Sequence, residues 1–137
     1  MTIADVDRRY APAPSPLPAS QREPIVNDFA IQVATVNGSG SQTANSAILR
    51  ALFKMGIPVA GKNIFPSNIQ GLPTWYVIRA SRQGFTARRE NAEIVALMNP
   101  VTAAEDLSKV YQDGVCFYDE DIRLDKSSRP DVVYYPM

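Results

Sequence analysis

The sequence predicts an α/β fold with three layers: a mostly parallel mixed sheet, a Rossmann-like first βα unit and an antiparallel hairpin. Three observations predict this class. Apolar, β-branched runs alternate with helix-like patterns along residues 27–137. A glycine-rich turn, NGSGS at 37–41, separates the first run from the first helical pattern. With 137 residues, 45% of them hydrophobic, the chain is long enough to form one domain with a real core.

The first half of this domain predicts a strand, a helix and a second strand. Residues 28–36 are almost continuously apolar, as expected of a central buried strand. Residues 43–55 repeat apolar side chains at helical spacing, and Gly56 is suited to end that helix. Residues 57–60 predict a short strand, and a long loop follows at 61–73.

The second half continues with strands. Residues 74–80, rich in aromatic and β-branched side chains, predict a third strand. Residues 82–85 predict a hairpin turn, with a short fourth strand at 85–88. A fifth, mostly apolar strand is expected at 92–98.

The end of the chain predicts one more helix between strands. Thr102 and Glu105 have the spacing of a capping box, which predicts a helix that runs to about residue 113. Gly114 is expected to break it. Two further apolar runs predict the last strands, at 115–118 and 132–135.

Residues 1–26 form a separate segment that contains five of the eleven prolines. Proline at this density excludes a helix or a central strand and predicts an extended, polyproline-like arm. Two interpretations remain open: a disordered tail, which is favoured, or an arm laid over a partner subunit. The globular domain is therefore expected to occupy 27–137.

Charge and hydropathy exclude several partner classes. Fourteen basic residues balance fourteen acidic ones, so no net field attracts nucleic acid or an anionic membrane. No apolar stretch approaches the roughly 18 residues that span a bilayer. The first ten residues lack the apolar core of a signal peptide, which favours a cytoplasmic protein.

The residue types that usually carry catalysis are scarce. The chain contains no histidine, which excludes Ser-His-Asp and Cys-His mechanisms and histidine-ligated metals. Its one cysteine, Cys116, lies in an apolar run and is expected to be an inert buried thiol. We therefore assign no catalytic residue and no metal ligand, and expect a binding part of something larger.

The glycine turn is the first candidate binding site. A strand, a glycine-rich turn and a helix leave backbone N–H groups that can hold an anion. The dinucleotide fingerprint fails, because Thr43 stands where a third glycine is needed and no acidic residue follows about 20 residues later. Tight packing of strand against helix is about as well supported as ligand binding. The candidate contacts are Gly38, Ser39, Gly40, Ser41 and Gln42.

The loop at 61–73 is the second candidate. It is polar and almost uncharged, and its glycines permit close approach of a ligand to the backbone. Loops at the carboxyl ends of neighbouring strands converge in such folds, so this loop could face the glycine turn. An ordinary surface loop is an equally good interpretation. The candidate contacts are Lys62, Ser67, Asn68, Gln70 and Gly71.

Two longer stretches carry a family resemblance. They are VNGSGSQTANSAILRALFKMGIPVAGKNIFPSNIQGLPTWYVIRAS and LMNPVTAAEDLSKVYQDGVCFYDED. The combination resembles the gamma-type domain of the 2-oxoacid:ferredoxin oxidoreductases, most of all the version at the start of the alpha subunit of the 2-oxoglutarate-type enzymes. Relatives carry a Y-G-P-E-x-R-G-G-like loop at 65–72, in which Pro66 and Gly71 match while Asn68 and Gln70 differ.

The resemblance implies a function. This family couples oxidative decarboxylation of a 2-oxoacid to acyl-CoA formation and ferredoxin reduction, using thiamine diphosphate and iron–sulfur clusters. Its gamma-type domain helps to cover the active site and contributes to the CoA-binding region. The implied partners are the remaining alpha-subunit domains, a beta subunit that carries thiamine diphosphate and the cluster, and ferredoxin through the complex. Alone, the chain is expected to bind no cofactor and to catalyse nothing.

An alternative from another class is a free-standing anion- or nucleotide-binding module with a regulatory or scaffold role. The two hypotheses differ in the surface they require. A domain of a larger oxidoreductase needs exposed apolar surface for its partners, whereas a free-standing module is expected to be a well-behaved monomer.

Overall fold

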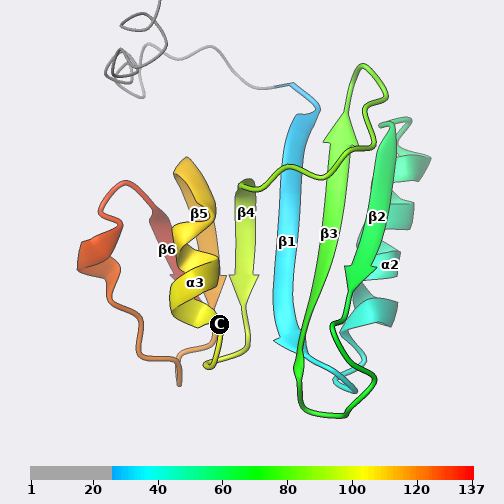
Figure 1. The fold of residues 1–137 in the computed structure, drawn as a ribbon. Helices are drawn as coiled ribbons and strands as arrows, with labels where there is room; N and C mark the ends of the chain where they lie inside the picture. The colour runs from blue at the N-terminus through cyan, green and yellow to red at the C-terminus, as the bar shows by residue number, and fades with distance from the viewer. Residues whose placement is uncertain (1–25) are drawn as a thin grey trace, which may run out of the picture.

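The computed structural model describes residues 26–137 (Figure 1). The arm predicted for 1–26 lies outside this part of the chain except for Val26. The described elements are β1 (Asp28–Val36), α2 (Ser41–Lys54), β2 (Val59–Ile64), β3 (Pro73–Ser81), β4 (Ala92–Leu97), α3 (Ala103–Ser108), β5 (Val110–Tyr118), the 3-10 turn η2 (Lys126–Ser128) and β6 (Val133–Pro136).

Within this part of the chain six strands form one sheet, in the order β2-β3-β1-β4-β5-β6. β1, β4, β5 and β6 are parallel, whereas β3 is antiparallel to both of its neighbours, β1 and β2. Figure 1 shows α3 in front of the sheet and α2 behind it. α2 contacts β2 and β3, and α3 contacts β4 and β5. The three-layer α/β fold, with a mostly parallel sheet and an antiparallel hairpin (β2–β3), is confirmed.

The first βα unit forms where the sequence places it. β1 has the predicted bounds, and α2 begins at Ser41, two residues earlier than predicted. The early start is possible because Gly40 adopts φ +76°, a left-handed conformation that turns the chain directly into the helix. At the other end Gly56 has φ +80° and terminates α2 as predicted.

Two predictions between β2 and β4 are wrong. β2 runs from Val59 to Ile64 and so takes the first residues of the predicted loop. Pairing with β3 overrides the low strand propensity of its Gly-Lys-Asn segment. No strand forms at 85–88. The β3–β4 connection instead crosses the front of the sheet as an irregular segment (Figure 1).

The last predicted helix is also too long. α3 ends at Ser108, and the residues from Val110 onward belong to β5. Gly114 lies inside this strand rather than at a helix end. A Cβ at this position would lie 2.7 Å from the Tyr111 carbonyl oxygen and 2.8 Å from that of Glu93, so a glycine allows the strands to approach. The capping box does not form, because Thr102 makes no side-chain cap.

The main core lies between the sheet and α3. Val95, Leu97 and Cys116 are completely buried on this face and pack with Leu107 of the helix. Burial raises the pKa of the Cys116 thiol to about 11, an effect that the nearby Lys126 only partly offsets. The expectation of an inert buried thiol is therefore supported.

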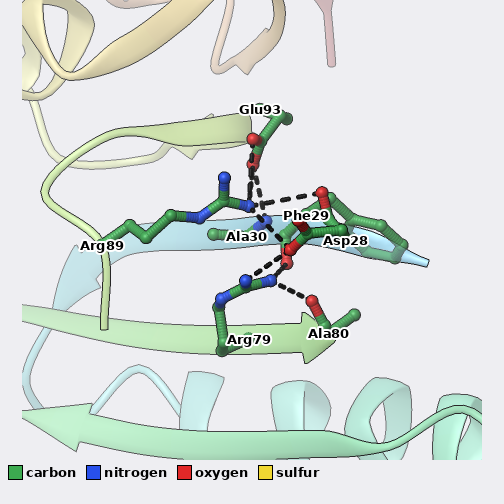
Figure 2. A network of polar contacts seen from close by, with 7 residues as sticks. All are labelled: Asp28, Phe29, Ala30, Arg79, Ala80, Arg89 and Glu93. Atoms are coloured by element: carbon green, nitrogen blue, oxygen red, sulfur yellow. Dashed lines mark hydrogen bonds and ion pairs between the residues drawn. The ribbon is translucent and has the colours of Figure 1, made fainter. Parts of the chain in front are cut away.

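An ion-pair network fixes the beginning of β1 (Figure 2). The buried Arg79 of β3 pairs with the Asp28 carboxylate. Arg89, in the β3–β4 connection, lies 3.1 Å from a Glu93 carboxylate oxygen and 3.7 Å from that of Asp28. Glu93 in turn accepts the Ala30 N–H at 2.7 Å. The network attaches the crossing segment to the sheet at the end of β1 opposite the glycine turn.

Candidate functional site

The glycine turn and the β2–β3 loop meet at the carboxyl end of β1. Asn37 joins them: its N–H donates to the Leu72 carbonyl at 2.7 Å, and its carbonyl accepts the Gly71 N–H at 3.0 Å. Its side-chain Nδ2 donates to the carbonyls of Ile69, at 3.1 Å, and Ser67, at 3.3 Å. The two predicted candidate segments thus form one wall, and Asn37 sets their separation.

Gln70 covers one glycine of the turn. A Cβ at Gly38 would lie 3.1 Å from Gln70 Cγ, and Gly38 has φ +88°. Both the conformation and the close approach therefore favour glycine here. Of the other loop candidates, Ser67 accepts the Ile69 N–H on its hydroxyl at 3.2 Å, and Asn68 is exposed.

The amino-terminal end of α2 opens beside this wall. Gly40 cannot cap it with a side chain, and the first turn carries no acidic residue. The backbone N–H groups of Ser41 and Gln42 belong to the first turn, where an α-helix supplies no acceptor. The Ser41 hydroxyl bonds the Thr35 hydroxyl at 2.8 Å, which attaches the turn to β1. The positive end of the helix dipole therefore faces the hollow.

Three polar side chains, those of Gln42, Asn63 and Thr74, line the space beside the turn. The Asn63 Nδ2 donates to Gln42 Oε1 at 3.1 Å, and the Thr74 hydroxyl is 3.3 Å from Asn63 Oδ1. They complete a hollow of about 340 Å³. It is lined by Asn37, Gly38, Gly40, Ser41, Gln42, Thr43, Asn63 and Thr74.

Lys62, a predicted contact, does not line this hollow, whereas its neighbour Asn63 does. Lys62 is paired with Val77 on the other face of the sheet and lines a separate hollow with Arg79 and Arg88. The structure therefore does not bring Lys62 to the glycine turn. Asn63 does reach Gln42, because successive residues of a strand point to opposite faces. The signal for Asn63 is the register of β2, which becomes evident only once the strand is recognised.

Asn45 is a second polar residue that sequence reasoning missed. It is the buried residue of α2, 4% exposed, and its Nδ2 has no hydrogen-bond partner among residues 26–137. It lines an adjoining hollow of about 280 Å³ together with Ser39, Ser41 and Met98. Its position within a helix of apolar repeats gives no local sign of this role.

The chemistry that this arrangement supports is binding. The lining of the 340 Å³ hollow consists of backbone, hydroxyl and amide groups and contains no charged side chain. Such groups donate hydrogen bonds to a phosphate, a carboxylate or an amide carbonyl. None of them is a general base near neutral pH.

Comparison with known proteins gives the family. The sequence profile of the pyruvate ferredoxin/flavodoxin oxidoreductase family (POR) matches residues 30–136. No curated protein is significantly similar to the chain. No helix within 26–137 is both long and apolar enough to cross a membrane.

Solved structures share the fold at low sequence identity. The PORC subunit of pyruvate oxidoreductase from Thermotoga maritima has a TM-score of 0.59 at 16% identity, over 78% of this chain and 57% of that one. The 2-oxoglutarate:ferredoxin oxidoreductase from Magnetococcus marinus, with 2-oxoglutarate, coenzyme A and succinyl-CoA bound, has a TM-score of 0.69 at 23% identity. The match covers 82% of this chain and 20% of that one. The gamma subunit of a keto/oxoacid ferredoxin oxidoreductase from Geobacter sulfurreducens has a TM-score of 0.57 at 13% identity. The match covers 80% of this chain and 59% of that one.

The match spans less than two thirds of each of these chains. Two of the three are single subunits of oxidoreductases, and the third is a much longer polypeptide. The resemblance seen in the sequence is confirmed by the profile over most of the domain and by the fold. This chain belongs to the pyruvate ferredoxin/flavodoxin oxidoreductase family and has the fold of its gamma-type domains.

Proposed function

We propose that this chain is a non-catalytic domain or subunit of a thiamine-diphosphate-dependent 2-oxoacid:ferredoxin oxidoreductase, and that its glycine turn contributes to the CoA-binding region. The substrate we propose is 2-oxoglutarate and the compartment is the cytoplasm. The remaining alpha-subunit domains and a beta subunit supply thiamine diphosphate and the iron–sulfur cluster, and ferredoxin is reduced through the assembled complex.

One observation supports the CoA role above all: the hollow between the glycine turn, Gln42 and Asn63 presents donors and no charged group. CoA carries phosphates, which suit the N–H groups of a helix N-terminus, and two amides, which suit side-chain amides. The residues present therefore fit a single phosphate or an amide of CoA. They would bind and orient that group, while the acyl transfer takes place on parts of the complex outside this chain.

The choice of 2-oxoglutarate is supported by fold similarity. Among the three solved structures named above, the 2-oxoglutarate enzyme has the highest TM-score, 0.69. That enzyme was solved with CoA and succinyl-CoA bound. Pyruvate is the other substrate that the comparisons name, and competition assays with both acids on the assembled enzyme distinguish them.

The test uses matched pairs in the assembled oxidoreductase. Gly40 and Gly56 lie at the two ends of α2, have φ of +76° and +80°, and leave free space where a Cβ would be placed. Gly40→Ala and Gly56→Ala therefore strain the backbone equally, by about 1–2 kcal/mol. We expect Gly40→Ala to raise the KM for CoA at least fivefold and Gly56→Ala to leave it unchanged.

A second pair tests the side chains. Gln42→Ala removes the amide that faces the hollow, and Gln83→Ala removes an exposed amide outside it. We expect the KM for CoA to rise only in the first. Equal KM values in all four variants would contradict the CoA role. Failure of the chain to assemble with oxidoreductase subunits, combined with nucleotide binding by the chain alone, would favour the free-standing module.

A further inference from the structure

We infer that the back of the sheet, over β4, β5 and β6, is the docking surface for one amphipathic α-helix from elsewhere in the oxidoreductase assembly. The inference rests on the proposed function, because the helix is taken to come from that assembly. We call this surface the open face. It consists of Ile94, Ala96, Val115, Phe117, Val133 and Tyr135.

The register of the parallel strands arranges these side chains in two rows. Ile94, Val115 and Val133 lie side by side in one row. Ala96, Phe117 and Tyr135 form the other, in which the Phe117 and Tyr135 rings stack with centroids 5.4 Å apart. All six side chains are apolar or aromatic, and none is charged. The open face is therefore a continuous apolar surface.

Both rows continue, across β1, into a region that is buried. Ile31 pairs with Ile94 on one side and with Ile78 on the other. In the second row Val33 connects Ala96 to Tyr76 in the same way. Ile78 is completely buried, on the face that α2 covers. On this face α2 therefore covers β2 and β3, whereas no helix of residues 26–137 covers β4, β5 and β6.

Alternating burial along the strands shows the same asymmetry. Cys116 is completely buried under α3, whereas its neighbours Val115 and Phe117, which point to the back, are only half-buried. On β6 the exposed fractions of Val133 and Tyr135 reach 48% and 50%. Parallel sheets normally carry helices on both faces. Residues 26–137 supply a helix to the front of β4 and β5 and none to their back.

At the border of the open face, the docked helix also has to meet a polar group. Asn45 of α2 and Met98, just after β4, line the hollow of about 280 Å³ where the open face meets the helix. The Asn45 Nδ2 is buried without a partner among residues 26–137, and such a group costs roughly 1–3 kcal/mol. Ile48, one turn further along α2, is 43% exposed. The occupant therefore offers an apolar side to Ile48 and a hydrogen-bond acceptor to Asn45.

The size of the open face selects a helix rather than a second copy of this chain. The open face is three strands wide, from β4 to β6, which is about 14 Å at the usual strand spacing. One helix, about 10–12 Å in diameter, covers that width beside α2. The two rows together occupy roughly 200 Å². A stable dimer needs about 800 Å² from each partner, so the open face alone is too small for one.

The relatives have enough additional chain to provide such a helix. The matched region is 57% and 59% of the two solved gamma subunits and 20% of the 2-oxoglutarate enzyme. More than two fifths of each subunit therefore lies outside the match.

The test places a reactive group on the open face. Cys116 is the one cysteine of the sequence and is completely buried, so Val133→Cys introduces a single accessible thiol. Gln83→Cys, outside the open face, is the control. Maleimide labelling is followed for the full chain alone and for the same variant in the purified oxidoreductase complex. A photo-reactive benzoylphenylalanine at position 135 then identifies the contacting peptide.

We expect assembly to slow labelling of Val133→Cys at least tenfold more than that of Gln83→Cys. The cross-linked peptide should carry apolar residues at i, i+3, i+4 and i+7. Equal protection at both positions, a cross-link to an extended segment, or a cross-link to another copy of this chain overturns the inference. Fast labelling within an assembled, CoA-dependent complex also overturns it while the proposed function stands. If the chain does not assemble with oxidoreductase subunits, both this inference and the proposed function are wrong.

Discussion

The Trp75 indole donates its Nε1–H to Asp106 Oδ1 at 2.9 Å, and this bond connects β3 to α3 across the front of the sheet. Gln32 of β1 donates its side-chain amide to the same oxygen at 3.0 Å. Asp106 is completely buried, so one carboxylate joins three elements of the fold. Burial raises its pKa above the usual value of 3.8, although the nearby Thr102 hydroxyl and the hydrogen bond from Trp75 partly oppose this.

This raised pKa predicts how stability depends on pH. Folded Asp106 binds its proton more tightly than the unfolded chain does, so its contribution falls as pH rises from about 4 through the folded pKa. Asp106→Asn keeps an acceptor oxygen for both donors and cannot ionise. The difference in unfolding free energy, variant minus wild type, should therefore increase between pH 4 and 7. Urea unfolding followed by the fluorescence of Trp75, the one tryptophan of the sequence, measures it. A constant difference would contradict it.

Arg129 and Asp131 predict the opposite pH dependence. The Asp131 carboxylate accepts two hydrogen bonds from Arg129, at 2.7 and 2.9 Å, which lower its pKa to about 2. Its stabilising contribution is present above pH 3.8 and disappears as pH falls toward 2. We expect Asp131→Asn to cost about 1–2 kcal/mol at pH 7 and almost nothing near pH 2. Urea titrations at the two pH values test this, and an equal loss at both would contradict it.

Much of the sheet could be predicted because its strands are strong hydrophobic runs. β1 and β3 agree with the sequence within one residue at each end. The glycine turn and the loop also converge as predicted, although β3 lies between β1 and β2: its first residue, Pro73, pairs with Val36 at the carboxyl end of β1. Asn37 confirms it by hydrogen bonds to both segments.

The errors arise where distant contacts override local preference. β2 includes Gly61 and Lys62 because β3 pairs with them, and a sequence window contains no such partner. α3 ends early because β5 must begin at Val110 to pair with Ala92 of β4. The role of Asp106 is hidden for a similar reason. A single acidic residue in a polar helix predicts exposure, and only the tertiary fold places Trp75 and Gln32 against it.

Alanine should destabilise the protein more at Gly114 than at Gly61, because a new Cβ meets backbone atoms at the first position and side-chain atoms at the second. A Cβ at Gly114 would lie within 2.8 Å of the Tyr111 and Glu93 carbonyl oxygens, which are fixed in the sheet. At Gly61 it would meet the Tyr76 hydroxyl at 2.7 Å and a Leu49 methyl at 2.8 Å, and side chains can rotate away. We expect Gly114→Ala to lose about 3 kcal/mol or more and Gly61→Ala about 1–2. Chemical denaturation compares them, and a larger loss at Gly61 would contradict the prediction.

Cys116 should be unreactive while the chain is folded. Its side chain is completely buried and burial raises its pKa to about 11, so both access and thiolate content are low at pH 8. We expect iodoacetamide to modify it only in denaturant. Modification of the native chain at the rate of a free thiol would show that β5 opens frequently or is packed differently.

The proposal that the glycine turn binds CoA is tested most directly by amide hydrogen exchange in the assembled oxidoreductase. Residues 37–43 and 65–72 form the two sides joined by Asn37. Exchange at both should slow when CoA is added, whereas residues 82–88, at the other end of β3, should be unaffected. Unchanged exchange at 37–43, in a complex that turns over with CoA, would show that the turn does not contact it.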